Sequence, residues 1–127
     1  MKILLAVDGS DYTKKMLAYL STHDELFSAS NSYTLLTVQP QLPARARSVV
    51  GKEAVEAFQR EESEKVLSPV TKFLVRHGID AKTIAKVGHA GEIISKTADS
   101  GKFDLVVMGS VATQVLAHCK VPVLLVR

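Results

Sequence analysis

The regular alternation of short aliphatic blocks with longer segments of helical periodicity limits the fold of this sequence more than any other feature. The blocks suited to strands are Lys2–Val7, Tyr33–Val38, Ala81–Val87, Asp104–Met108 and Val121–Val126. Most of them are apolar at successive positions, as strands covered on both faces must be. Strands joined through helices pair in parallel by right-handed crossovers. The sequence therefore predicts an α/β fold: an open, doubly wound, parallel five-stranded sheet with helices on both faces.

Four helical segments are expected between the strands. The first begins near Asp11, after Ser10 as its N-cap, and the second begins at Lys52, after a loop over residues 40–51. Pro69 is expected to kink or interrupt the second helix, because proline lacks the backbone donor. Both segments supply apolar residues to the expected core: Met16, Leu17, Leu20, Phe27, Val55, Phe58, Val66, Leu67, Val70, Phe73 and Leu74.

Length and composition favour one domain over residues 1–127. Sixteen Lys and Arg stand against thirteen Asp and Glu, and aromatic residues make up 6% with no Trp, so we expect no nucleic-acid partner. No apolar run is long enough to cross a membrane, so we expect no membrane partner. The single cysteine, Cys119, excludes an intrachain disulfide and fits a reducing compartment, so we expect a cytoplasmic protein.

Glycines and polar residues follow the predicted strands, at the sheet edge where α/β folds bind ligands. They are Asp8-Gly9-Ser10, Val38-Gln39, Val87-Gly88-His89 and Gly109-Ser110. A carboxylate can accept hydrogen bonds from ribose hydroxyls, and glycine lets backbone amides approach a phosphate. An ordinary turn leading into a capped helix is the alternative interpretation of the first segment.

The sequence predicts neither a catalytic nor a metal-binding residue. Its histidines show no metal-ligand spacing, and no Ser–His–Asp or paired-carboxylate arrangement can be argued. His89 could face a ligand, but we interpret it as an exposed loop residue. Arg45 and Arg47 could approach phosphates from the loop after the second strand, although a solvated loop is the preferred interpretation. We interpret Cys119 as an inert thiol.

Five segments, in the right order and at about the right spacing, resemble the universal stress protein family. They are Met1–Ser10, Leu35–Val38, Val87–Ile94, Asp104–Ser110 and Val111–Arg127, and together they span essentially the whole chain. The resemblance implies the strand order 3-2-1-4-5. It also implies a small homodimeric module that binds ATP or AMP, with or without Mg²⁺, in stress response or signalling. Such a module would be at most a slow ATP hydrolase.

Functional residues are carried over from the family onto matching positions. Asp8 would hold the ribose, Val38 would meet adenine through its backbone, and Met108-Gly109 would begin the phosphate loop. The full set implied for nucleotide binding is Val7, Asp8, Gly9, Ser10, Val38, Val87, Gly88, Met108, Gly109, Ser110 and Val111. The set implied for a homodimer through the last strand is Val121, Val123, Leu124, Leu125 and Val126.

One departure from the family lies directly after the fourth strand. ATP-binding members carry G-x2-G-x9-G-[ST] there, whereas this chain has only Gly109-Ser110 before Val111. Gly109 and Val121 stand about eleven residues apart, close to the minimum of about ten to twelve for a helical crossover. Either the glycine-rich loop is deleted in this protein, or a loop belongs between positions 109 and 111 and is missing from the printed sequence. The close match of the flanking segments favours the second interpretation.

Two other functions remain open at this point. Without the glycine-rich loop, the chain could be an interaction module that has lost nucleotide binding. An ATP pyrophosphatase-type adenylating enzyme is the second alternative, but such enzymes place a Ser-Gly-Gly-x-Asp-Ser loop after the first strand. Here that position reads Asp8-Gly9-Ser10 and lacks the paired glycines.

Overall fold

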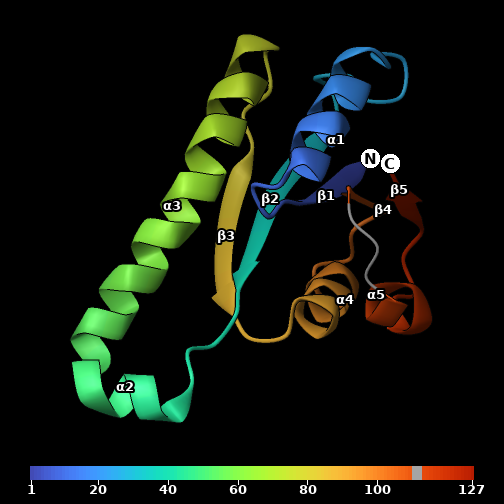
Figure 1. Ribbon diagram of the computed structural model, residues 1–127. Helices are drawn as coiled ribbons and strands as arrows, with labels where there is room; N and C mark the ends of the chain where they lie inside the picture. The colour runs from blue at the N-terminus through green and yellow to red at the C-terminus, as the bar shows by residue number, and fades with distance from the viewer. Residues whose placement is uncertain (110–112) are drawn as a thin grey trace.

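Five strands form one parallel sheet in the order β3-β2-β1-β4-β5 (Figure 1). The computed structural model describes residues 1–109 and 113–127. The strands are β1 (Lys2–Ala6), β2 (Ser32–Gln39), β3 (Lys82–Val87), β4 (Leu105–Met108) and β5 (Val123–Leu125). The predicted fold class is confirmed, and so is the strand order that the resemblance implied.

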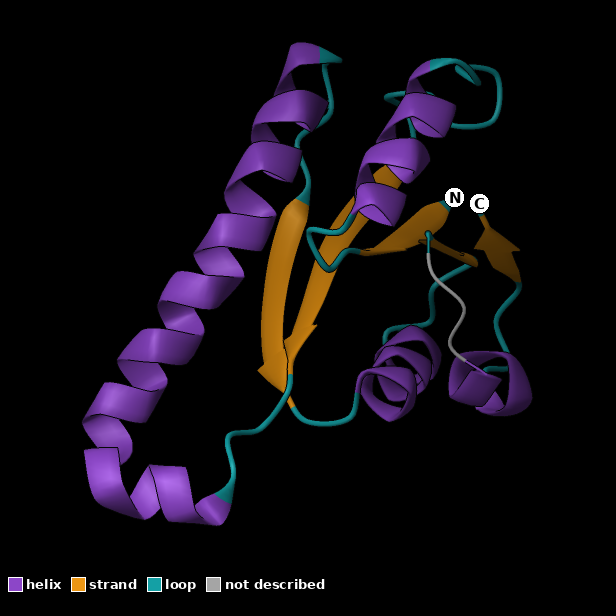
Figure 2. Ribbon diagram, in the orientation of Figure 1, coloured by secondary structure: helices purple, strands orange, loops and turns teal. Residues whose placement is uncertain are grey.

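Helices cover both faces of this sheet (Figure 2). They are α1 (Asp11–Ser21), α2 (Ala44–Val50), α3 (Lys52–Arg76), α4 (Ala90–Ser100) and α5 (Thr113–His118). Buried residues of α1 and α3 pack on one face of the sheet, and those of α4 and α5 pack on the other. The central strand β1 shows the reason for its continuous apolar sequence: Ile3 and Leu5 face the first layer, Leu4 faces the second, and all three are fully buried.

The segment over residues 40–51 is not simply a loop, as predicted, because it contains α2. Pro43 stands at the N-cap of α2, where a proline is tolerated because the first amides of a helix have no partner inside it. Gly51, with φ +87°, separates α2 from α3. Pro40 precedes this seven-residue helix and Pro43 stands at its start, so neither proline interrupts it.

The helix α3 differs from its prediction in two ways. It runs as one helix of 25 residues through Pro69, so the predicted interruption is wrong. Phe58 was expected in the core, but 48% of its surface is exposed. The N-terminal part of α3 extends with α2 beyond the ends of β2 and β3 (Figure 1), so this part of the helix lacks a sheet beneath it.

Candidate functional site

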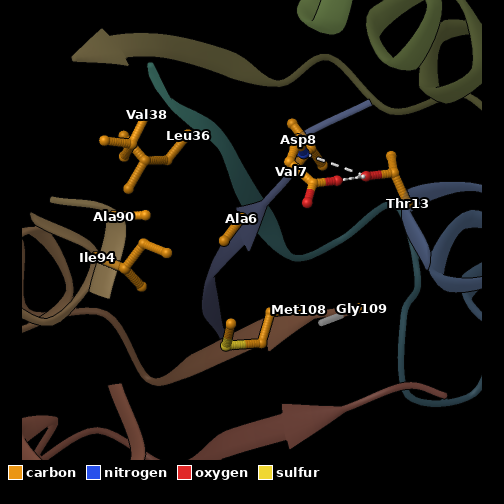
Figure 3. Close-up of a pocket in the computed structure, with 10 residues that line it drawn as sticks. All are labelled: Ala6, Val7, Asp8, Thr13, Leu36, Val38, Ala90, Ile94, Met108 and Gly109. Atoms are coloured by element: carbon orange, nitrogen blue, oxygen red, sulfur yellow. Dashed lines mark hydrogen bonds between the residues drawn. The ribbon is translucent and has the colours of Figure 1, made fainter. Parts of the chain in front are cut away.

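A small cleft lies at the carboxyl edge of the sheet, where the strand order reverses. The chain leaves β1 for β2 on one side and reaches β4 on the other, and such switch points are where open α/β sheets bind ligands. We call this the strand-end cleft (Figure 3). Its lining residues are Ala6, Val7, Asp8, Thr13, Leu36, Val38, Ala90, Ile94, Met108 and Gly109.

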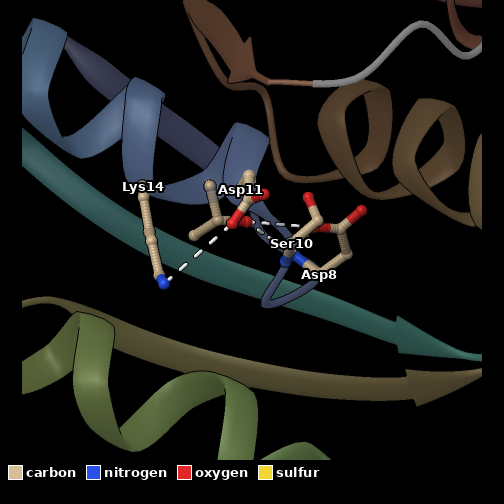
Figure 4. A network of polar contacts seen from close by, with 5 residues as sticks. Asp8, Ser10, Asp11 and Lys14 are labelled. Carbon is tan, nitrogen blue, oxygen red and sulfur yellow. Dashed lines mark hydrogen bonds and ion pairs between the residues drawn. The ribbon is translucent and has the colours of Figure 1, made fainter.

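Among the described residues that line this cleft, Asp8 alone carries a charge, and hydrogen bonds hold its side chain in place. Its Oδ1 accepts from the Ser10 amide at 2.9 Å (Figure 4) and from the Thr13 hydroxyl at 3.0 Å (Figure 3). The Thr13 hydroxyl also accepts from the Asp8 amide at 3.2 Å. Oδ2 accepts no hydrogen bond within the described residues, so it is available to a ligand donor.

The same contacts decide the ionisation of Asp8. Partial burial disfavours the charged form and acts to raise the pKa, but hydrogen bonds from Ser10 and Thr13 outweigh it. The pKa of Asp8 is therefore lowered from its usual 3.8. At neutral pH the cleft holds an oriented carboxylate.

Thr13 was not among the residues proposed from the sequence. It lies in the first turn of α1 and is 5% exposed, so its polar group is buried and must find a partner nearby. One sequence signal could have identified Thr13: it stands at an inward-facing position in the first turn of the helix, shortly after the Asp that ends the first strand. Ser10 occupies the predicted N-cap position, but its side chain makes no capping hydrogen bond.

Gly109 closes the cleft on the side of β4. A Cβ at this position would overlap the main-chain oxygen of Tyr12. The end of β4 therefore packs directly on the backbone of the first turn of α1. This close packing explains why residue 109 must be glycine, whether or not a ligand is bound.

The rest of the cleft is apolar and comes from four parts of the chain. Its residues are Ala6 and Val7 at the end of β1, Leu36 and Val38 on β2, Ala90 and Ile94 on α4, and Met108 at the end of β4 (Figure 3). Val7, Val38 and Met108 were predicted, whereas the α4 residues were not, because only the packing of α4 on the sheet brings them there. Such a surface suits a flat apolar group beside the carboxylate.

The volume of the strand-end cleft is about 80 Å³. Pockets that enclose a drug-sized ligand measure roughly 300 to 1,000 Å³. A nucleotide therefore would not be enclosed in this cleft as it stands. It would lie across the strand ends with part of its surface in solvent.

Four further nucleotide-binding predictions, Gly9, Ser10, Val87 and Gly88, do not line the cleft. Gly9 and Ser10 line a hollow between α1 and α3, and Val87 lines a hollow beside α2. The Gly88 amide donates to the Gln39 carbonyl at 2.9 Å. Ser110 and Val111, with the point where a loop was suspected to be missing, lie outside the described residues.

The predicted dimer strand β5 lies at an edge of the sheet, paired only with β4. Val121, Val123, Leu124 and Leu125 are partly exposed, whereas Val126 is buried within the chain at 8% exposure. The Val126 amide donates to the Met108 carbonyl at 2.9 Å. The main-chain groups of Val126 thus already serve the pairing with β4.

The interpretations of the other polar residues need one correction. His89 is exposed at the N-cap of α4, as interpreted from the sequence, but Arg45 and Arg47 belong to α2 and not to a loop. Cys119 is a free, partly buried thiol. In the described ranges, no three His, Cys, Asp or Glu side chains gather as metal ligands would, and no helix has the length and apolar character needed to cross a membrane.

Comparison with known proteins adds to this geometry. The chain is similar to a universal stress protein family protein from Burkholderia pseudomallei, with 28% identity, a TM-score of 0.73, and coverage of 98% of this chain and 94% of that chain. It is also similar to one from Arabidopsis thaliana solved with AMP bound, with 17% identity, a TM-score of 0.76, and coverage of 99% and 90%. A third similar structure is a universal stress protein in complex with cAMP, with 21% identity, a TM-score of 0.65, and coverage of 100% and 96%.

No curated protein matches this sequence. The sequence profile of the universal stress protein family matches residues 1–110, which include β1 to β4. This chain belongs to the universal stress protein family.

Proposed function

We propose that the strand-end cleft binds an adenine nucleotide, AMP or ATP, and that the protein serves as a small nucleotide-responsive module in stress response or signalling. The observation that carries the proposal is Asp8, an oriented carboxylate with one free oxygen beside an apolar surface at the switch point of the sheet. The relatives solved with AMP and with cAMP support this choice of ligand class.

In the proposed complex, Oδ2 of Asp8 accepts a hydrogen bond from a ribose hydroxyl. The adenine ring lies on the apolar surface formed by Val38, Ile94 and Met108, and the backbone of Val38 meets its polar edge. The phosphates extend past Gly109 towards solvent. In the sequence as printed, no glycine-rich stretch follows Gly109, so few backbone amides are available to the phosphates and we expect AMP and ATP to bind this form with similar affinity.

Calorimetric titration with AMP, and with ATP and Mg²⁺, tests the proposal. We expect Asp8→Ala to weaken binding of both nucleotides by about tenfold or more, since a hydrogen bond to a charged group contributes about 1.5–3 kcal/mol. Asp11→Ala is the matched control: Asp11 is an exposed carboxylate in the first turn of α1, outside the cleft, and its loss should leave affinity unchanged. Equal effects of the two substitutions would contradict the assignment of Asp8.

An interaction module without nucleotide binding is the second candidate, and the small volume of the cleft favours it. The absence of binding heat with either nucleotide, together with an unchanged melting temperature, would decide for this candidate. The intact mass of the natural protein should be measured before the titration. If it exceeds 13.8 kDa by the mass of about a dozen residues, a loop is missing from the printed sequence, and the titration must use the protein that contains it.

We further propose that the protein is cytoplasmic and forms a homodimer through β5, with Val121, Val123, Leu124 and Leu125 at the interface. Val126 also belongs to this strand, but its side chain is buried within the chain and would support the contact from behind. Partly exposed apolar side chains and an unpaired strand edge support this contact, because an open apolar edge favours pairing with another chain.

A further inference from the structure

The strand β3 forms the edge of the sheet opposite to β5, and among the described strands it pairs with β2 alone (Figure 1). Its residues pair in a continuous register, from Lys82 opposite Thr34 to Val87 opposite Gln39. All are exposed except Ile84, which is partly buried. The sheet therefore has a second open edge, of six residues in β3 against three in β5.

The main-chain groups of β3 alternate between the two sides of the strand. The Gly88 amide donates to the Gln39 carbonyl at 2.9 Å, so Ile84 and Lys86, at even spacing from Gly88, also direct their amides and carbonyls to β2. The residues between them direct these groups away from the sheet: Thr83, Ala85 and Val87. The outward groups form no hydrogen bond with the rest of the described chain. They are open to a strand of another chain.

The side chains of β3 give this edge its chemistry. Ile84 packs in the layer beneath α4 and α5, so Lys82 and Lys86, two residues away on either side, lie on the same face of the strand. Both lysines are exposed, and neither forms an ion pair with a described residue. The carboxylate of Glu92, in the first turn of α4, is already paired with Lys96. The edge thus presents two free positive charges with an apolar side chain between them.

The two lysines determine which strands can pair with this edge. Lysine on an edge strand acts against pairing with a similar strand. If two copies of β3 paired in antiparallel over their full length, the lysines of one copy would lie opposite or diagonal to those of the other, and such like-charge pairs are destabilising. Acidic side chains in the added strand would replace this repulsion by attraction. The edge therefore disfavours a second copy and favours an acidic strand.

We propose that β3 is a docking edge for an extended acidic segment of another protein, which adds a further strand to the sheet. The segment carries the pattern Glu-x-Val-x-Glu, with its acidic side chains beside Lys82 and Lys86 and its apolar side chain beside Ile84. Main-chain hydrogen bonds to the outward groups of β3 supply affinity, and the lysines select the sequence. No described residue of β3 except Val87 borders a hollow of the surface, and none lines the strand-end cleft, so this interaction is independent of nucleotide binding.

Amide hydrogen exchange of the full chain, with and without the end-blocked peptide Thr-Glu-Thr-Val-Thr-Glu-Thr, tests the proposal. We expect saturable binding that slows exchange at the outward amides of Thr83, Ala85 and Val87, by about tenfold when nine-tenths of the protein is bound. The amides of Ile84 and Lys86 are already bonded to β2, so their exchange should change little. Peptide binding without this alternation would place the peptide elsewhere and would overturn the proposal.

A charge exchange tests the selection of sequence. Lys82→Glu/Lys86→Glu should weaken binding of the acidic peptide by about tenfold or more at low salt, and the loss should shrink as salt is added. The same variant should bind the peptide Thr-Lys-Thr-Val-Thr-Lys-Thr, which the wild type should reject, and a folding defect could not produce this gain. The matched control, Lys14→Glu/Lys120→Glu, makes the same change in net charge at exposed positions outside β3 and should keep wild-type affinity.

A backbone variant tests the outward groups themselves. Ala85→Pro removes a donor that faces away from β2, a position where an edge strand tolerates proline, so the protein should stay folded and lose the acidic peptide. A thermal unfolding curve verifies the fold. Equal binding of the acidic and basic peptides by the wild type would overturn the proposal. Slower exchange at the outward amides with rising protein concentration, in the absence of peptide, would also overturn it and assign the edge to a second copy.

Discussion

At the scale of single residues, the candidate site depends on the pair formed by Asp8 and Thr13. The threonine hydroxyl both donates to the carboxylate and accepts from the Asp8 amide. One buried side chain thus fixes the strand end and the direction in which the free carboxylate oxygen faces. This arrangement links the stability of the turn after β1 to the binding proposed for the cleft.

We predict that Thr13→Val raises the pKa of Asp8, lowers the stability of the protein by about 1 kcal/mol and weakens nucleotide binding. In the wild type the pKa of Asp8 is lowered, so its contribution to stability is complete above pH 3.8 and is lost as the pH falls through the lower pKa of the folded state. Carboxyl titration by NMR measures the pKa. Thr22→Val, at an exposed position after α1, should leave it unchanged.

Gly109 gives a second prediction at this scale. Gly109→Ala should destabilise the protein by about 1–3 kcal/mol, because the new methyl group would overlap the main chain of Tyr12 and force β4 and α1 apart. Denaturant unfolding measures the change. Gly51→Ala provides the comparison: Gly51 has φ +87° and nothing within 4 Å, so it reports backbone strain alone, at about 1–3 kcal/mol. A smaller effect at Gly109 than at Gly51 would show that β4 adjusts freely.

At the scale of elements, the long helix α3 has a weak point at Pro69. This residue is exposed inside the helix, and it cannot supply the amide that the Lys65 carbonyl would receive four residues later. The helix remains continuous because Leu67, Val70 and Leu74 anchor it on the sheet. Burial has overridden the local preference of the sequence.

Pro69→Ala should therefore stabilise the protein by about 1–2 kcal/mol, since it restores a helical donor and relieves the clash of the proline ring, while the unfolded chain gains some freedom. Thermal and denaturant unfolding measure the change, and Lys72→Ala, exposed one turn later, controls for helix propensity alone. A loss of stability would mean that the packing of α3 on the sheet requires the proline.

At the scale of the whole molecule, the proposed dimer depends on the free edge of β5. Val126 and Pro122 direct backbone groups to β4, so the alternate residues Val123 and Leu125 direct their amides outward. We predict that Leu125→Pro, which removes one outward donor, converts a dimer into a folded monomer in sedimentation experiments. Leu125→Val, which only shortens the side chain, should remain dimeric. A wild-type monomer at all concentrations would exclude this dimer.

Much of the fold was predictable because strands buried on both faces must be apolar throughout, as Ile3 to Leu5 are. In the site, Asp8, Val38, Met108 and Gly109 were predictable because each stands at a strand end. Thr13, Ala90 and Ile94 were not, because only the packing of helices on the sheet brings them to the cleft. The errors at Phe58 and α2 have a related cause: a sequence shows which residues are apolar, but not where the sheet beneath a helix ends.

The sheet is built from strands of very unequal length, eight residues in β2 against three in β5. Few main-chain bonds hold the short edge, so its amides should exchange with deuterated solvent well before those of β1 and β2. A second chain laid along β5 would slow that exchange without touching the rest of the protein. The exchange rate of the β5 amides would therefore report on dimer formation and would fall as the protein concentration rises.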